Sequence, residues 1–131
     1  MAYNLLKGKR GLIFGALNEN SIAWKVAERA FEEGTIFVLT NAPAAMRLGE
    51  ISDLATKCQT IAIPADATNI ADLENLVEKS MEHLGGKLDF ILHSIGMSPN
   101  VRKSVPYDHI NYDYYLKTLD IQDLIPIIAF T

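Results

Sequence analysis

The chain has 131 residues, about the size of one compact domain, and 49% of them are hydrophobic. Its formal net charge of −4 argues against binding to nucleic acid, which needs a basic face. The single cysteine, Cys58, excludes a disulfide within the chain and does not by itself make a metal site. No apolar run approaches the ~20 residues that a bilayer requires, and the apolar stretch after Arg10 is too short for a secretion signal. We therefore expect a cytoplasmic protein of one domain, residues 1–131, without membrane or metal partners.

Short apolar runs alternate with longer amphipathic ones. Residues 11–15 form an apolar run that ends in a glycine, which predicts a buried strand. Residues 21–33 place apolar side chains at helical spacing, and Gly34 supplies a C-terminal stop. Residues 35–40 are β-branched and aromatic, which predicts a second strand.

The rest of the chain continues this alternation. The sequence next predicts a helix over 44–57 and a strand over 60–63. A helix follows that is capped by Asn69 and ended by Gly85 and Gly86, and after it a strand over 88–93. A loop from Met97 to about His109 then leads to a helix that begins near Asn111. Strands separated by helices of this length indicate βαβ units and a parallel sheet. We expect the α/β class, a Rossmann-type doubly wound sheet represented by its first four or so strands.

In such a sheet, ligands bind beyond the carboxyl ends of the strands. After the first strand, Gly15 permits a sharp turn, and the following helix offers free N–H groups and a positive dipole end to a pyrophosphate. The hydroxyl of Ser21 would add to that site. The spacing differs from the G-x-G-x-x-G fingerprint, so an ordinary strand-to-helix turn with Ser21 as N-cap remains an alternative.

The segment after the second strand reads Thr40-Asn41-Ala42-Pro43 and carries neither the acid that recognises a ribose nor a base for a 2′-phosphate. The side chain of Asn41 is able to bind a ribose hydroxyl, and Arg47 follows some residues later. The choice between NADH and NADPH stays open on this evidence and leans toward NADH.

The third and fourth strands are also followed by candidate ligand residues. Asp66 and the small Ala67 suit the amino group of an adenine, although a turn or helix-capping aspartate is the alternative. Ser94-Ile95-Gly96 follows the fourth strand, where Gly96 lets the backbone pass close to a flat ligand; a plain loop is the alternative. All four segments belong to the same edge of the predicted sheet.

Three of these motifs together resemble a known family. The run Gly15-x5-Ser21-Ile22-Ala23, the lone Asp66, and His93-Ser94-Ile95-Gly96 are similar to motifs of the NADH-dependent enoyl-[acyl-carrier-protein] reductases, divergent members of the short-chain dehydrogenase/reductase superfamily. The resemblance covers about 5–121 and corresponds to the N-terminal half of such proteins. It implies an oxidoreductase that reduces the trans-2 double bond of enoyl thioesters in type II fatty acid biosynthesis, with NAD as cofactor, enoyl-acyl carrier protein as substrate and a homotetrameric assembly.

The resemblance also assigns roles to individual positions. It implies that the pyrophosphate and the nearby ribose are held by Gly15, Ala16, Ser21 and Ile22. For the adenosine part, it implies that Asn41 and Ala42 lie by the ribose and that Asp66 and Ala67 bracket the adenine. It further implies that Ser94, Ile95 and Gly96 lie along the nicotinamide and that Ser98 touches substrate.

The catalytic residues of the family have no counterpart here. Its tyrosine and lysine lie after the fifth strand in a Tyr-x6-Lys arrangement, beyond the last residue of this chain. Tyr112 and Lys117 have the wrong spacing. We expect the tyrosines at 107, 112, 114 and 115 to pack the last helix, and His93 and His109 to be structural.

Two other functions compete with the reductase interpretation. A non-catalytic dinucleotide-binding fragment would explain the missing Tyr/Lys pair. A short-chain reductase acting on a ketone or alcohol is disfavoured, since the commoner members carry a glycine-rich T-G-x-x-x-G-x-G turn in place of Ser21-Ile-Ala.

The segment after Ile121 also departs from the long helix that the resemblance implies, because Pro126 would interrupt a helix.

Overall fold

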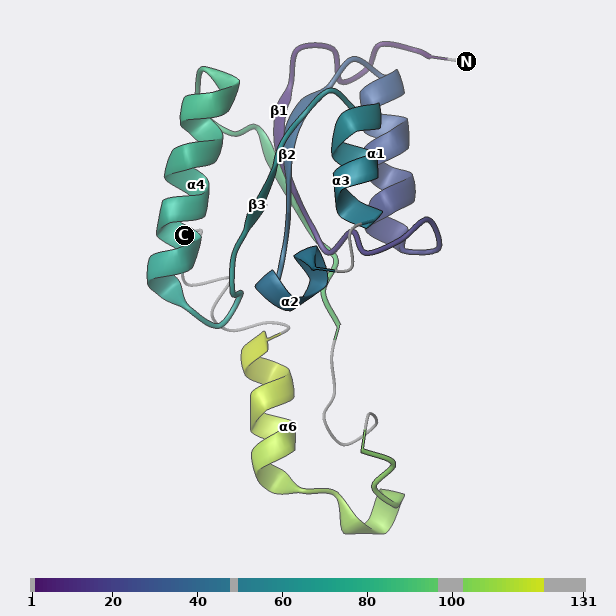
Figure 1. Ribbon diagram of the computed structural model, residues 1–131, viewed down its shortest axis with the longest axis vertical. Coiled ribbons are helices and arrows are strands. Elements are labelled where there is room, and N and C mark those ends of the chain that lie inside the picture. The colour runs from purple at the N-terminus through teal and green to yellow at the C-terminus, as the bar shows by residue number, and fades with distance from the viewer. Residues whose placement is uncertain (1, 48–49, 97–102, 122–131) are drawn as a thin grey trace.

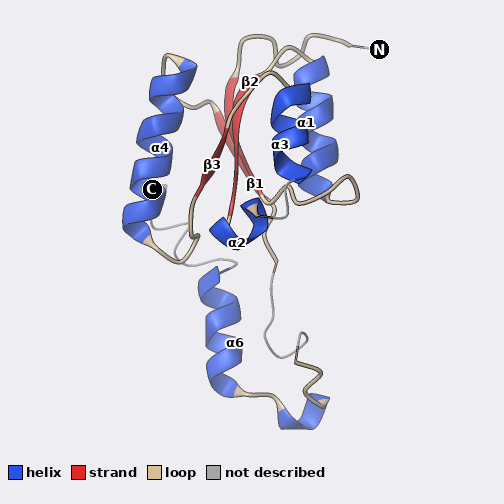
Figure 2. Cartoon of the chain, in the orientation of Figure 1, coloured by secondary structure: helices blue, strands red, loops and turns tan. Residues whose placement is uncertain are grey.

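Four parallel strands form one sheet in the order β3-β2-β1-β4, with helices on both faces (Figure 1). The computed structural model describes residues 2–47, 50–96 and 103–121. The strands are β1 (Arg10–Phe14), β2 (Ile36–Asn41), β3 (Ala62–Pro64) and β4 (Phe90–His93). Helices α1 (Ile22–Glu32) and α3 (Glu50–Lys57) cover one face and α4 (Ile70–Leu84) covers the other (Figure 2). This arrangement confirms the predicted doubly wound α/β architecture.

The two inner strands, β1 and β2, carry mostly apolar residues in their buried stretches, because helices cover both of their faces. Successive side chains of a strand point to opposite faces, so β1 contributes to two separate cores. Ile13 packs with α1 and α3 in one core, whereas Leu12 and Phe14 pack with α4 in the other. Leu12 and Ile13 are both completely buried.

The connections define where a ligand would bind. From β1 the chain passes through α1 to β2 on one side of β1, and from β3 it passes through α4 to β4 on the other side. The two crossovers lie on opposite faces of the sheet (Figure 1). The chain builds the sheet outward from β1 through β2 to β3 and then returns to the other side of β1 with β4, so the strand order switches between β1 and β4. Such a switch point opens a crevice at the carboxyl ends of the strands.

The predicted helix over 44–57 is wrong as a single element. The structure has a short α2 (Pro43–Met46), with proline at its first position, and then α3. Proline suits the first turn of a helix, where its missing N–H costs nothing. The remaining helices and strands lie within two residues of their predicted bounds, and Asn69 caps α4 as expected by accepting the N–H of Asp72 at 3.1 Å.

Beyond β4 the chain leaves the sheet. A 3-10 turn, η1 (Tyr107–His109), lies inside the predicted loop and is followed by α6 (Tyr112–Leu119) beyond the carboxyl edge of the sheet (Figure 1). Helix α6 buries none of its residues, and Tyr112 and Tyr115 are 70% and 51% exposed. The expectation that these tyrosines pack the last helix is therefore wrong, and Tyr107 is exposed as well. Tyr114 instead contacts Lys103, whose ammonium lies 4.6 Å from the centre of its ring.

No helix in the described part of the chain is long and apolar enough to cross a membrane.

Candidate functional site

The carboxyl ends of three strands meet at Gly15. Its N–H donates to the carbonyl oxygen of Thr40 at 3.1 Å, and the N–H of Ser94 donates to that of Phe14 at 3.2 Å. Gly15 has φ +105°, and a Cβ on it would overlap the carbonyl oxygen of Ser94. Both the backbone conformation and the close approach require a glycine here. The chain thus turns sharply between β1 and β4, at the predicted binding edge.

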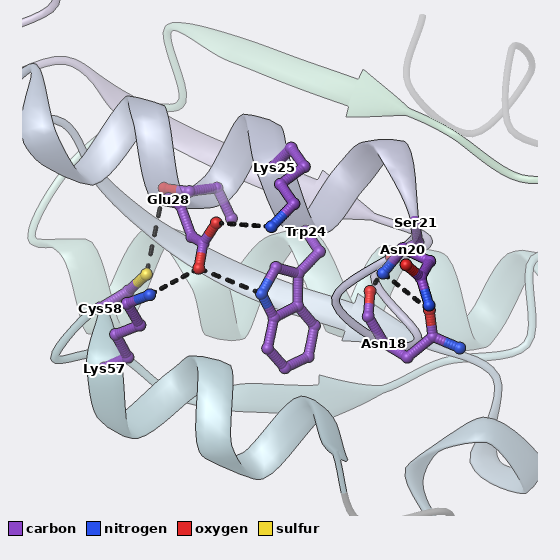
Figure 3. A network of polar contacts seen from close by, with 9 residues as sticks. Asn18, Asn20, Ser21, Trp24, Lys25, Glu28, Lys57 and Cys58 are labelled. Atoms are coloured by element: carbon purple, nitrogen blue, oxygen red, sulfur yellow. Dashed lines mark hydrogen bonds and ion pairs between the residues drawn. The ribbon is translucent and has the colours of Figure 1, made fainter.

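The turn over 15–21 is closed by its own side chains (Figure 3). The hydroxyl of Ser21 accepts the N–H of Leu17 at 3.2 Å and donates to the carbonyl oxygen of Asn18 at 2.7 Å. The side-chain oxygen of Asn18 accepts the N–H of Asn20 at 3.0 Å. Ser21 stands at the N-cap position of α1, but its hydroxyl caps no helical N–H, so its side chain organises the turn instead.

The N-terminus of α1 has the chemistry of an anion site. No side chain caps it, and its first turn contains no acidic residue. The first N–H groups of a helix have no partner within the helix and carry its positive dipole end. Lys25, one turn further on, adds a positive side chain that pairs with Glu28 at 3.4 Å. A phosphate group placed against Ser21 and Ile22 would meet donors and no carboxylate of the helix.

Asn41, the last residue of β2, connects its strand to both neighbours. Its side-chain nitrogen donates to the carbonyl oxygen of Ala16 at 2.9 Å, and its side-chain oxygen accepts the N–H of Ala42 at 2.8 Å. Its own carbonyl oxygen accepts the N–H of Ala65, after β3, at 3.0 Å. Arg47, the other candidate from this segment, is exposed at the end of α2.

Asp66 forms a turn after β3 and keeps one oxygen for another partner. Its Oδ1 accepts the N–H of Thr68 at 2.8 Å and the hydroxyl of Thr68 at 2.7 Å. Its N–H donates to the carboxylate of Asp72 at 3.0 Å. Two hydrogen bonds from Thr68 hold the pKa of Asp66 below its usual range, and the bond from the hydroxyl contributes more than the bond from the backbone N–H. The carboxylate therefore stays ionised at neutral pH, and its Oδ2 has no hydrogen-bond partner among the described residues.

The segment after β4 lies open. Ser94 and Ile95 are half-buried and Gly96 is exposed. A Cβ on Gly96 would meet no atom within 4 Å, so there is open space beside the backbone at this point. Ser98, the predicted substrate contact, lies outside the described residues.

The described site residues predicted from the sequence all lie at or after the carboxyl ends of strands, at one edge of the sheet. The register places Phe14 beside Thr40 on one side and His93 on the other, so the segments after β1, β2 and β4 start level with one another. Sequence reasoning missed Asn18 and Thr68, which fix the turns around Ser21 and Asp66. In both turns the side chain of an asparagine or aspartate accepts the N–H of the residue two positions later, Asn18 from Asn20 and Asp66 from Thr68. That two-residue spacing is the sequence signal that would have found them.

The described ranges contain no group of three or more His, Cys, Asp or Glu side chains that would hold an ion. His93 is exposed at the end of β4, and His109 lies 3.8 Å from the carboxylate of Asp108 at the surface. Cys58 is buried, and its burial raises the pKa of the thiol.

Comparison with known proteins adds curated relatives. The chain is 32% identical over 121 residues to enoyl-[acyl-carrier-protein] reductase [NADH] 1 of Rhizobium meliloti. The aligned region covers 92% of this chain and 44% of the relative. It is 39% identical over 102 residues to the enoyl-[acyl-carrier-protein] reductase [NADH] FabI of Aquifex aeolicus, with 72% of this chain and 35% of the relative covered. The chain therefore spans less than half the length of these relatives.

Solved structures of proteins named FabI are also similar to this chain. FabI from Alistipes finegoldii superimposes with a TM-score of 0.93 at 65% identity, covering 98% of this chain and 50% of that one. The FabI–NADH complex from the same organism gives a TM-score of 0.92 over 97% of this chain and 46% of that one. The family model described as enoyl-(acyl carrier protein) reductase matches residues 15–123 and so begins at the glycine of the first turn. This chain therefore belongs to the enoyl-(acyl carrier protein) reductase family.

Proposed function

We propose that this chain binds NADH at the carboxyl edge of its sheet and provides the cofactor-binding half of an enoyl-[acyl-carrier-protein] reductase. One observation carries the proposal: the N-terminus of α1, free of caps and of acidic side chains, is entered through a turn that Gly15 and Ser21 fix at the β1–β4 crevice. The names of the curated relatives, which specify NADH, support it. So does the NADH complex of a FabI that is 65% identical to this chain.

The residues of the edge fit the parts of a dinucleotide. The N–H groups at the start of α1 suit the pyrophosphate. Gly15 and Ala16 begin the turn that leads to this helix start, and Ser21 and Ile22 stand at it. The ionised Asp66 offers its free Oδ2 to the adenine amino group, beside Ala67. The open space at Gly96 leaves room for the nicotinamide along Ser94 and Ile95.

When bound, NADH supplies the hydride that reduces the trans-2 double bond of an enoyl thioester. In this chain the 15–21 turn would orient the cofactor and the segment after β4 would hold the nicotinamide in place. By the resemblance to the family, its tyrosine and lysine would lie outside the residues of this chain. We propose the same biological setting as for the family: fatty acid biosynthesis in the cytoplasm, with an acyl carrier protein as the donor of substrate and a tetrameric assembly.

A second function, dinucleotide binding without turnover, is favoured by one observation. The 131 residues contain no Tyr-x6-Lys arrangement. The two functions share the same cofactor site and differ only in catalysis.

Titration of the purified chain with NADH, followed by the fluorescence of the nicotinamide, tests both functions. We expect saturable binding that NAD⁺ displaces. Oxidation of NADH that depends on a crotonyl thioester would establish the reductase, and binding without oxidation would establish the second function. Absence of NADH binding by the folded chain would overturn both.

A further inference from the structure

We propose that Asn41 is a positioning residue that latches the 15–21 turn in place, and not a ligand of the adenosine ribose. The inference rests on the proposed function and deepens it, because it assigns to the end of β2 a role in shaping the pyrophosphate site on the neighbouring strand. It also replaces the ribose-binding role expected from the sequence.

Both polar ends of the Asn41 side chain are engaged within the protein. Its Nδ2 donates to the carbonyl oxygen of Ala16, 25 residues away in sequence, at 2.9 Å. Its Oδ1 accepts the N–H of Ala42 at 2.8 Å. One of the two Nδ2 hydrogens and one of the two Oδ1 lone pairs are therefore used within the protein, and the amide is oriented toward the turn by two hydrogen bonds at once.

The latch acts at the first residues of the turn. Ala16 is completely buried, and Gly15 is held by the hydrogen bond from its N–H to the carbonyl oxygen of Thr40. The end of β2 thus holds the turn at two consecutive residues, once through its main chain and once through the side chain of Asn41. Without the amide, the Ala16 carbonyl would lose its partner in a buried setting, which favours a shifted turn. A shifted turn would change the direction of the N–H groups at the start of α1, which are the proposed pyrophosphate ligands.

The two roles predict opposite effects of an aspartate at this position. Dinucleotide-binding folds commonly present a carboxylate here to the ribose hydroxyls of NAD. If Asn41 were a ribose ligand, Asn41→Asp would keep or increase affinity for NADH. A carboxylate has no hydrogen to donate to Ala16 and its charge repels that carbonyl oxygen, so the latch predicts a loss.

The experiment compares Asn41→Asp, Asn41→Ala and Asn75→Asp. Asn75 is exposed on α4, so its substitution adds the same charge away from the edge. Hydrogen exchange of residues 15–21 is measured without cofactor, and NADH affinity by fluorescence titration. We expect faster exchange in both Asn41 variants and about a tenfold rise in Kd, as for the loss of one hydrogen bond. Asn75→Asp should change neither quantity.

Unchanged exchange in the Asn41 variants would overturn the latch, as would an unchanged or lower Kd for Asn41→Asp. If Asn41→Asp does not fold, exchange in Asn41→Ala decides, since a ribose ligand has no effect on the cofactor-free turn. Failure of the wild-type chain to bind NADH would overturn the proposed function, whereas exchange in the cofactor-free protein would still decide whether Asn41 holds the turn.

Discussion

The carbonyl oxygen of Ser94 occupies the space that a Cβ on Gly15 would need. This contact joins the segments after β1 and β4, the two strands between which the crevice opens. It means that the first turn and the proposed nicotinamide segment are packed backbone against backbone. A side chain at residue 15 would therefore disturb both segments at once.

Gly15→Ala should destabilise the protein by about 2–4 kcal/mol, since the positive φ costs about 1–2 kcal/mol and the backbone overlap adds to it. Gly85→Ala is the matched control. Gly85 also has a positive φ, +74°, but a Cβ there meets no atom within 4 Å. It should lose only about 1 kcal/mol. Urea unfolding measures both, and equal losses would contradict the role of the Ser94 contact.

Thr68→Val should make the stability depend less on pH, because the hydroxyl of Thr68 is the main cause of the lowered pKa of Asp66. A carboxyl with a lowered pKa in the folded state stabilises the protein above its unfolded pKa, about 3.9. That stabilisation is lost as the pH falls through the lowered folded value. We expect Thr68→Val to cost less than about 1 kcal/mol at pH 7, since Asp66 is exposed, and progressively less in acid.

Thr56→Val is the control for the Thr68 experiment. The hydroxyl of Thr56 donates to the carbonyl oxygen of Ser52 within α3 at 3.0 Å, so no ionisable group is involved. Its effect on stability should be the same at pH 7 and in acid. Urea unfolding at several pH values measures both variants. A pH-independent loss in Thr68→Val would contradict the assigned cause of the low pKa of Asp66.

The order of strands and helices, the glycine of the first turn and the cap at Asn69 were predictable from the sequence. Each depends on local periodicity or on the conformational needs of one residue. The partners of Asn41 and the exposure of α6 were not predictable, because they depend on which distant segments meet. The bond from Asn41 to Ala16 arises only once β1 and β2 lie side by side, and no local pattern records it.

Glu28 joins α1 to α3, and replacing it should weaken that contact (Figure 3). Its Oε1 accepts from the ammonium of Lys57 at 2.6 Å and from the indole N–H of Trp24 at 3.2 Å. The hydrogen bond from Lys57 is the main cause that lowers the pKa of Glu28, and the same bond raises that of Lys57. Glu28→Gln should lower stability slightly at neutral pH, less so at high salt, because the pair lies at the surface.

The pH dependence of Glu28→Gln has a definite sign. The wild-type carboxylate contributes above its unfolded pKa, so the gap between wild type and variant should close as the pH falls through the lowered folded pKa. Glu74→Gln, an exposed position on α4, makes the same charge change without this partner. Thermal unfolding across pH distinguishes the two. A double variant with Lys57→Met that loses as much as both single variants together would show that the pair does not interact.

Glu33 fixes the start of the chain to the end of α1, and its loss should be among the more costly single changes. The side chain is 7% exposed. Its carboxylate accepts the N–H of Tyr3 at 2.9 Å and that of Leu5 at 3.2 Å, and it pairs with Arg29 at 2.6 Å. Glu33→Ala would leave these donors without their acceptor, a loss of about 1–3 kcal/mol.

The neighbouring Glu32 provides the control for Glu33→Ala. Glu32 pairs with the same Arg29 at 2.9 Å, but its side chain is 58% exposed. Glu32→Ala should change stability by less than about 1 kcal/mol, since exposed ion pairs contribute little. Hydrogen exchange should rise at Tyr3 and Leu5 only in Glu33→Ala, because only that carboxylate accepts their N–H groups. Similar losses of stability in the two variants, with unchanged exchange at these amides, would mean that Arg29 and not the N-terminal segment accounts for the contribution of Glu33.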